Sequence, residues 1–224
     1  MQPTHCTPII SLLNQMDFID LKPIQLTTPD DTRLTYSWLV NADDKYPPAR
    51  WQTTLVIPNS PRAVEIGEQL DTFNLNFKKA LKAAFPDKKK DDYKWNELPW
   101  KWEDHEELKL KNALILKCNK KTHAPDGTPK APPIIFDSRQ KEPLNDEQKQ
   151  KYDKIGPGTT AQVALYVSQY NLGVGTGCRL TPAAVNIKNF IPFGSQANTA
   201  EDWGFTVDAP QQGKAPTPGD EFDF

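Results

Sequence analysis

Two tyrosines, Tyr166 and Tyr170, lie where their rings could take part in molecular recognition. The segment 160–170 (TAQVALYVSQY) alternates apolar and polar residues. A strand would therefore direct its valines and Leu165 to one face and both tyrosine rings to the other. A planar ring can stack against a base, and a cation beside it can bind the phosphate. This pattern favours a surface for single-stranded nucleic acid.

Basic residues gather in the segment 109–141, where eight Lys or Arg stand against two acidic residues. The segment 17–44 is the reverse, with six Asp and two basic residues, although the whole chain has a net charge of only −2. A basic face is the usual electrostatic footprint of a polyanionic partner. An alternative stays open, because a half-buried tyrosine pair beside solvated lysines is common on sheets. The basic positions considered are Lys111, Lys117, Lys120, Lys121, Lys130, Arg139 and Lys141.

The other aromatic residues are expected mainly to pack. Trp51, Tyr36 and Trp38 could stack bases, but packing in the core or at the rim of a barrel is the favoured interpretation, since large aromatic rings usually serve burial. The tryptophans of the segment 86–107 are interpreted as packing anchors of an irregular insertion. The glycines of 173–177 lack a following helix and a Lys-Ser/Thr pair, so they indicate a hairpin turn rather than a phosphate-binding loop.

No pattern indicates an enzyme, a metal site or a cofactor. The acidic residues of 103–107 have no His in a patterned spacing, and Cys118 with His123 lacks the paired spacing of a zinc site. The three cysteines are odd in number and far apart, which predicts free thiols in a reducing cytoplasm. No cleavable leader and no apolar run of membrane length is present. A soluble cytoplasmic protein is expected.

About five strands and one long helix are expected. The helix follows from apolar residues at three- and four-residue steps over 62–85, with Ser60 and Pro61 as its start. Strands punctuated by Gly and Pro favour a small β-barrel. We expect one folded domain over 1–207 and a flexible tail over 208–224. The segments with strand character are 33–40, 50–57, 109–118, 134–137, 160–170 and 178–191.

The chain ends in DEFDF, where three acidic residues alternate with two phenylalanines. A terminal segment with so little apolar area is expected to be disordered. It could dock into a basic, apolar pocket of a partner, or lie in the protein's own anion-binding groove until a polyanion displaces it. A solvated tail without a role is the third interpretation. The residues concerned are Asp220, Glu221, Phe222, Asp223 and Phe224.

With these parts in order, the sequence resembles the phage-encoded single-stranded DNA-binding proteins of the OB-fold type, which carry an acidic C-terminal tail ending in Phe. The resemblance covers about residues 30 to 224 and rests on the order of the pieces. The insertion 86–107 has no clear counterpart. The matching pieces are the strand 51–58 before the helix, LILKC (114–118), IIFDS (134–138), IGPG (155–158), the strand 160–170, the turn 173–177, the strand ending near 193–194, EDW (201–203) and DEFDF (220–224).

The resemblance implies a mainly β protein, with an OB-fold five-stranded Greek-key barrel, one long helix, long insertions and a disordered acidic tail. It implies sequence-independent coating of single-stranded DNA in phage replication, recombination and repair, without catalysis, in the cytoplasm of the host. The tail would recruit the replication polymerase and the helicase-primase, and the chain could form a homodimer. The alternatives are a β-barrel protein-interaction module and an RNA-binding OB-fold protein.

The resemblance also assigns roles to residues. Tyr166 and Tyr170 would stack bases, Phe222 and Phe224 would anchor the tail, and the tail acids would mimic phosphates. Arg50, Trp51 and Phe136 are assigned to the same DNA interface. The phosphate-binding residues would be Lys111, Lys117, Lys120, Lys121, Arg139 and Arg179.

Overall fold

The computed structural model describes residues 21–45, 47–172 and 175–194. The chain divides into two units, Met1–Phe193 and Gly194–Phe224, and every element below belongs to the first unit. The predicted boundary between residues 207 and 208 lies outside the described residues and stays a prediction. The strands are β1 (Ile24–Thr27), β2 (Arg33–Asp43), β3 (Arg50–Ile57), β4 (Trp100–His105), β5 (Leu110–Lys121), β6 (Ile134–Asp137), β7 (Thr159–Leu172) and β8 (Gly175–Asn189).

Five of these strands close into a barrel. β2 pairs with β3, β3 with β5, β5 with β8, β8 with β7, and β7 again with β2. The β5–β8 pair is parallel and the others are antiparallel. This circuit is that of an OB-fold, in which β3 and β5 are the second and third barrel strands. The predicted fold is confirmed.

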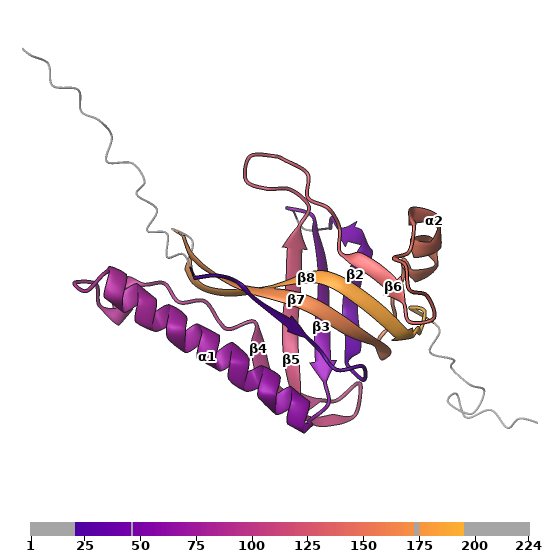
Figure 1. Cartoon of the computed structure of the whole chain (residues 1–224), viewed down its shortest axis with the longest axis horizontal. Helices are drawn as coiled ribbons and strands as arrows, with labels where there is room; N and C mark the ends of the chain where they lie inside the picture. Colours follow the sequence, from indigo (N-terminus) through magenta and orange to yellow (C-terminus); the bar gives the residue numbers. More distant parts are fainter. Residues whose placement is uncertain (1–20, 46, 173–174, 195–224) are drawn as a thin grey trace, which may run out of the picture. The chain divides into compact units, whose positions relative to one another are not determined.

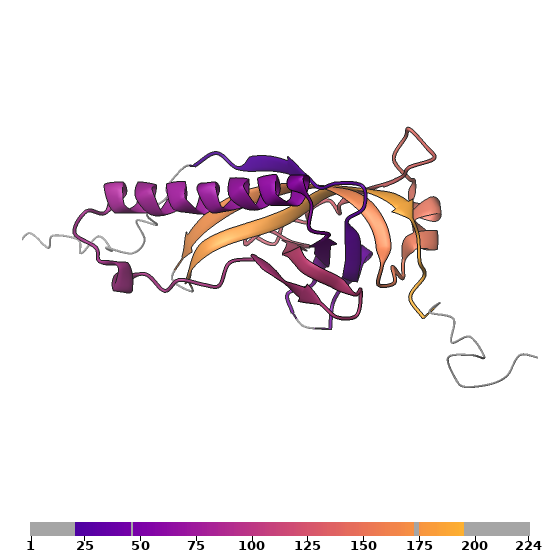
Figure 2. The same cartoon turned by 90° about the horizontal axis from the view of Figure 1, so that it is seen from below.

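The barrel has two layers that cross each other. β7 and β8 pass in front of β2, β3 and β5 in Figure 1, and the layers separate in the perpendicular view of Figure 2. β1 extends the first layer beside β7, β6 extends it beside β8, and β4 extends the second layer beside β5. The outer surfaces of the two layers therefore face in opposite directions.

The core lies between the layers. Every barrel strand contributes a leucine that is 0% exposed, and these are Leu34, Leu55, Leu116, Leu165 and Leu180. A second small cluster lies on the outer side of the sheet, where Val56, Ala113 and Ile115 are covered by Leu108 and Leu110. This cluster covers one end of the outer β3–β5 surface, and the open part is the end where residues 50–54 pair with 117–121.

The helix α1 (Pro61–Ala84) matches the predicted segment 62–85. The Ser60 hydroxyl accepts a hydrogen bond from the Ala63 amide, and Pro61 occupies the first turn, as expected for a helix start. Ile66, Leu70 and Phe77 are fully buried in the same core as the barrel leucines. Figure 1 shows α1 running beside β4, β5 and the β7–β8 hairpin, where it completes a barrel whose β5 and β8 meet at a single residue pair.

β1 and β4 were not predicted from the sequence. Strict alternation along 109–118 would place Leu110 on the same face as Leu114 and Leu116, but Leu110 packs in the outer cluster instead. Lys109 and Asn112 have positive φ angles of 52° and 44°, which break the period of two. The remaining short elements are a 3-10 turn at Lys90–Asp92, α2 (Asp146–Lys149) and a 3-10 turn at Gln150–Tyr152.

Candidate nucleic-acid interface

Basic and amide side chains lie on the open outer surface of β3 and β5. Gln52 is directly opposite Asn119, and the pairs on either side of it carry cations. Residues directly opposite in an antiparallel pair share a face. Gln52 and its neighbours point outward, because the intervening Thr53 and Leu55 are buried. The flanking pairs are Arg50 with Lys121 and Thr54 with Lys117.

Two exposed aromatic rings of β2 lie beside these side chains. Trp38 is 47% exposed and is directly opposite Gln52, while Tyr36 is 74% exposed. The packing interpretation of both residues is therefore wrong. The cause is a register shift between Thr35 and Trp38, where Tyr36 has a φ of 49°. Ser37 turns inward instead, and its hydroxyl lies 2.6 Å from the hydroxyl of Thr53.

The other layer carries the two predicted tyrosines. Tyr166 on β7 is 45% exposed, with Gln25 of β1 on one side and Thr181 of β8 on the other. Tyr170 is less free. Its hydroxyl accepts a hydrogen bond from Asn96 Nδ2 at 2.9 Å, and the Arg179 guanidinium lies 5.5 Å from its ring centre. Tyr170 is thus an ordered ring with a cation beside it.

Phe136, also assigned to the interface, lies on the same layer as Tyr166. It is half-buried on β6, opposite Asn186 of β8. A shallow pocket of about 310 Å³ beside it is lined by Gln162, Lys141 and Ala184, among others. The carbonyl oxygen of the Asn186 side chain is buried without a hydrogen-bond partner among the described residues. Phe136 therefore borders a polar hollow that could receive a donor group.

The two surfaces join where β5 meets β8. Cys118 pairs with Leu180 in a parallel register, so Asn119 neighbours Thr181 and Lys117 neighbours Arg179. The registers therefore connect one outward residue from each strand into a path around the outside of the barrel, which we call the cross-strand row. Measured along the sheet, this path covers four strand spacings of about 4.8 Å each, or about 19 Å. Its members, in order, are Trp38, Gln52, Asn119, Thr181 and Tyr166.

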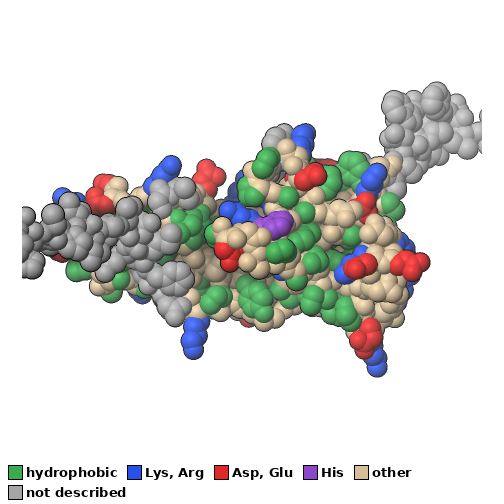
Figure 3. Space-filling view, turned by 90° about the horizontal axis from the view of Figure 1, so that it is seen from above, with side chains coloured by type: hydrophobic (Ala, Val, Ile, Leu, Met, Phe, Trp, Pro, Cys, Tyr) green, Lys and Arg blue, Asp and Glu red, His purple; other side chains and the backbone are tan. Residues whose placement is uncertain are grey.

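The cross-strand row has an aromatic ring at each end and polar side chains between them. Lys117 and Arg179 lie along one side of it, and Arg50 and Lys121 along the other. One carboxylate is close, because Asp43 accepts a hydrogen bond from Gln52 Nε2 at 2.7 Å. From above, apolar and uncharged side chains cover much of the visible face, and His, basic and acidic side chains also lie near its middle (Figure 3).

Several residues predicted for the interface lie apart from the cross-strand row. Trp51 is only 8% exposed and lies opposite Lys120, whose pKa is lowered by burial and by the nearby charge of Lys130. Lys111 lies six residues before Lys117, about 20 Å along the strand. Its ammonium group pairs with Asp104 at 2.7 Å.

Arg139 is an exposed side chain that is hydrogen-bonded to the buried carboxylate of Asp137. Its guanidinium donates to both carboxylate oxygens of Asp137, which also accepts a hydrogen bond from the Tyr152 hydroxyl at 2.6 Å. These contacts hold the pKa of Asp137 far below its usual range, with Arg139 as the main cause, and they raise the pKa of Arg139. Much of its charge is therefore already compensated, and it is a weaker phosphate ligand than the sequence suggests.

This network should make stability depend on pH. In the folded protein the pKa of Asp137 is lower than in the unfolded chain, where it is near 4. The carboxylate therefore contributes fully to the free energy of unfolding above about pH 4, and this contribution is lost as the pH falls through the pKa of the folded state. Asp137→Asn should reduce the free energy of unfolding at pH 7 by about 1.5–3 kcal/mol, as for a hydrogen bond to a charged group. In urea unfolding, the difference in free energy of unfolding between wild type and variant should be smaller at pH 3 than at pH 7. A gap that is the same at both pH values, or no larger than that of the exposed Glu142→Gln, would contradict this role.

Several sequence-based expectations concern residues outside the described part of the chain. These are Cys6, the turn residues Gly173 and Val174, the segment EDW (201–203) and the tail over 208–224. Cys118 and Cys178 are free thiols, as predicted. Both are buried, and burial raises the pKa of Cys178 to about 11. Within the described residues, no group of three or more His, Cys, Asp or Glu side chains is arranged to hold a metal ion. The helices of the same residues are too short or too polar to span a membrane.

Comparisons with known proteins agree on the fold. No protein-family model and no curated protein matches the sequence. The crystal structure of gp2.5, a single-stranded DNA-binding protein encoded by bacteriophage T7, superposes with a TM-score of 0.60 and 18% identity, over 87% of this chain and 100% of that one. The single-stranded DNA-binding protein from bacteriophage Enc34 gives a TM-score of 0.53 and 16% identity, over 80% and 89% of the two chains. A C-terminal truncation of the Enc34 protein superposes with a TM-score of 0.51 and 12% identity, over 75% of this chain and 88% of that one. The expected likeness in fold to phage single-stranded DNA-binding proteins is confirmed.

Proposed function

We propose that this chain binds single-stranded DNA, largely independently of sequence, along the cross-strand row. The observation that carries the proposal is the exposure of Trp38 and Tyr166 at the two ends of one line of polar side chains, flanked by four cations. Stacking on rings contributes about 1–3 kcal/mol per base and tolerates any base, because every base has a π-face. Coating and protection of single strands in phage replication, recombination and repair would follow from such binding.

The fold supports the same surface. OB-folds bind oligonucleotides on the face of their second and third strands, which are β3 and β5 here. The flanking cations, Arg50, Lys117, Lys121 and Arg179, suit a chain of phosphates. The proteins that share this fold are described as single-stranded DNA-binding proteins. Stacking on Trp38 and Tyr166 accepts any base, which agrees with sequence independence.

A fluorescence titration with oligo-dT at several salt concentrations tests this function. Four neutralised phosphates predict a slope of roughly −2.8 for log affinity against log salt, at about 0.7 per phosphate. Tryptophan emission should be quenched as bases stack. An RNA oligonucleotide of matching sequence separates DNA from RNA preference. Absence of binding at low salt, also after removal of the last five residues, would refute the function and leave a protein-interaction module.

We assign recruitment to the tail. Asp220, Glu221 and Asp223 alternate with Phe222 and Phe224, a pattern that suits a basic and apolar pocket on a replication polymerase or helicase-primase. Deleting 220–224 removes three negative charges, so DNA affinity should stay equal or rise while recruitment is lost. A pull-down of the polymerase and helicase-primase with full-length and tailless protein measures this. Undiminished capture by the tailless protein would contradict the assignment.

A matched control for the tail keeps its charge. Phe222→Ala with Phe224→Ala should abolish recruitment and leave DNA affinity unchanged, because the three carboxylates remain. If this variant gains DNA affinity to the same degree as the deletion, the phenylalanines compete with DNA, and the tail acts on its own protein.

A further inference from the structure

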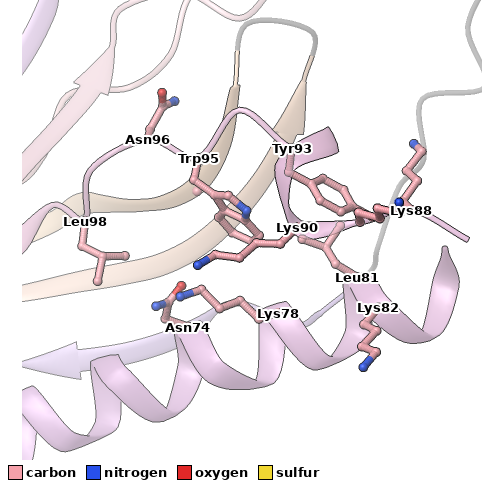
Figure 4. Close-up of a pocket in the computed structure, with 12 residues that line it drawn as sticks. Asn74, Lys78, Leu81, Lys82, Lys88, Lys90, Tyr93, Trp95, Asn96 and Leu98 are labelled. Atoms are coloured by element: carbon pink, nitrogen blue, oxygen red, sulfur yellow. The ribbon is translucent and has the colours of Figure 1, made fainter. Parts of the chain in front are cut away.

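A cavity of about 750 Å³ lies outside the cross-strand row, between the second half of α1, the insertion at residues 88–98 and the start of β8 (Figure 4). Ligand pockets usually enclose about 300–1,000 Å³, so this one is of suitable size for a nucleotide. None of its lining side chains is acidic. The lining residues are Asn74, Lys78, Leu81, Lys82, Lys88, Lys89, Lys90, Tyr93, Trp95, Asn96, Leu98 and Gly177.

The cavity wall combines apolar side chains with ordered aromatic rings. Trp95 packs edge-on against Phe77 of α1, with ring centres 6.1 Å apart, and Tyr93 lies 5.8 Å from Trp95. Leu81 and Leu98 complete the apolar part of the lining. The insertion thus does more than pack, because its rings and α1 together enclose a hollow.

Two buried polar atoms belong to the residues of this wall. Tyr93 Oη and Trp95 Nε1 are buried and have no hydrogen-bond partner in the described part of the chain. Buried polar groups almost always find a partner, so two such groups in the lining of one cavity indicate a ligand that supplies acceptors. The side-chain amides of Asn74 and Asn96 add both donors and acceptors, as the edges of bases require.

Lysines supply the charge that such a ligand must balance. Figure 4 shows Lys78 of α1 and Lys90 of the insertion extending beside Trp95. Lys82 also lines the cavity, but its ammonium group points away from the rings (Figure 4). The Lys78 ammonium group lies 5.4 Å from the centre of the Trp95 ring, so cation and ring belong to one site. A ligand with an anionic part and a flat ring fits this arrangement.

The cavity adjoins the predicted DNA surface. Asn96 lines the cavity and donates to the hydroxyl of Tyr170 at 2.9 Å. Gly177 also lines it, and a Cβ there would lie 3.0 Å from that hydroxyl, so the Tyr170 ring packs directly over this residue. A bound DNA strand that passes Arg179 and Tyr170 would therefore place its next nucleotide at the cavity.

We infer that this cavity binds one nucleotide of the single strand that occupies the cross-strand row, with the base against the aromatic wall and the phosphate on the lysines of α1. The inference rests on the proposed function and extends its site beyond the barrel. An acidic peptide with aromatic side chains matches the same charge, but the continuity with Tyr170 and the amide groups favours a nucleotide.

A paired variant of α1 tests the inference. Lys78→Ala with Lys82→Ala should lower the salt slope for a long oligo-dT by roughly 0.7, for one phosphate, and weaken affinity about tenfold or more at low salt. An oligonucleotide too short to reach the cavity should bind both proteins equally. Lys79→Ala is the matched control, since Lys79 lies on the same helix but does not line the cavity.

A photoreactive 4-thiothymidine placed at each position of the oligonucleotide locates the base directly. Crosslinks from one position to residues 93–98 are expected, and crosslinks confined to the barrel strands would overturn the inference. If wild type binds DNA and the paired variant keeps the slope of the Lys79→Ala control, this inference fails alone. If wild type binds no DNA, it fails together with the proposed function. The paired variant could instead lose binding to a DEFDF peptide and keep its DNA binding. That result would assign the cavity to a peptide and overturn the inference that it binds a nucleotide.

Discussion

Replacing Trp38 and Tyr166 together with Ala should weaken the binding of oligo-dT about 100-fold, and each single change should weaken it about tenfold. Each ring is expected to stack one base, at about 1–3 kcal/mol per base. The two residues are separated by about 19 Å along the sheet, so their effects should add. Both rings are exposed in the free protein, at 47% and 45%, so their removal opens no cavity in the core.

The double-mutant cycle decides which surface the strand uses. Fluorescence anisotropy with a labelled oligo-dT gives the four affinities. If only Trp38→Ala weakens binding, the strand stays on the β3–β5 layer, and if only Tyr166→Ala does, it stays on the β7–β8 layer. Either result would refute the proposal that one DNA strand follows the whole cross-strand row. Unchanged affinity in both variants, with the fold intact, would refute base stacking on these rings.

Matched controls separate ring loss from other effects. Trp38→Phe and Tyr166→Phe keep a ring and should keep most of the affinity. Phe193 is 68% exposed but lies outside the cross-strand row, so Phe193→Ala should bind like wild type. A similar loss in Phe193→Ala would mean that exposed rings act nonspecifically.

The elements that could be predicted from the sequence are those fixed by local pattern. β3 and β6 have the predicted bounds, and α1 begins and ends within one residue of its prediction. In each case the apolar period coincides with a strong boundary signal, such as Ser60 with Pro61 before the helix. Local periodicity and end signals are sufficient for such segments.

The candidate site was only half predictable, because it depends on register. Tyr166 follows from simple alternation along β7. Trp38 does not, since a period of two places it on the same face as the buried Leu34, and only the irregularity at Tyr36 turns it outward. The meeting of β5 and β8 at Cys118 and Leu180 is a contact between distant segments and left no local signal.

Charge counting also overestimated the basic surface. The sequence places eight cations in 109–141, but Lys111 pairs with Asp104, and Arg139 pairs with a carboxylate only two residues away. The Asp137–Arg139 spacing was visible in the sequence, but the inward direction of Asp137 and its bond to Tyr152 were not. Conversely, the fold brings lysines of α1 and of the insertion, which lie outside the basic segment 109–141, around one cavity.

Phe77→Ala should lower the free energy of unfolding by about 3–5 kcal/mol, as expected for a large buried aromatic side chain. Phe77 is 0% exposed in α1 and contacts both the barrel core and the Trp95 ring. At about 2–4 °C per kcal/mol for a chain of this size, Tm should fall by roughly 6–20 °C. Thermal unfolding followed by circular dichroism measures this, with Leu75→Ala as the control, since Leu75 lies on the same helix and is 51% exposed.

The same variant separates the two parts of the DNA site. The Phe77 ring supports Trp95 from the α1 side, whereas the cross-strand row is built from barrel strands alone. Well below its Tm, Phe77→Ala should therefore keep tight binding of short oligonucleotides and lose the extra affinity of long ones. A loss of stability no greater than that of Leu75→Ala would mean that α1 does not form part of the core. Equal weakening for short and long oligonucleotides would mean that the barrel surface itself depends on the helix, and the row and the cavity would then be one cooperative site.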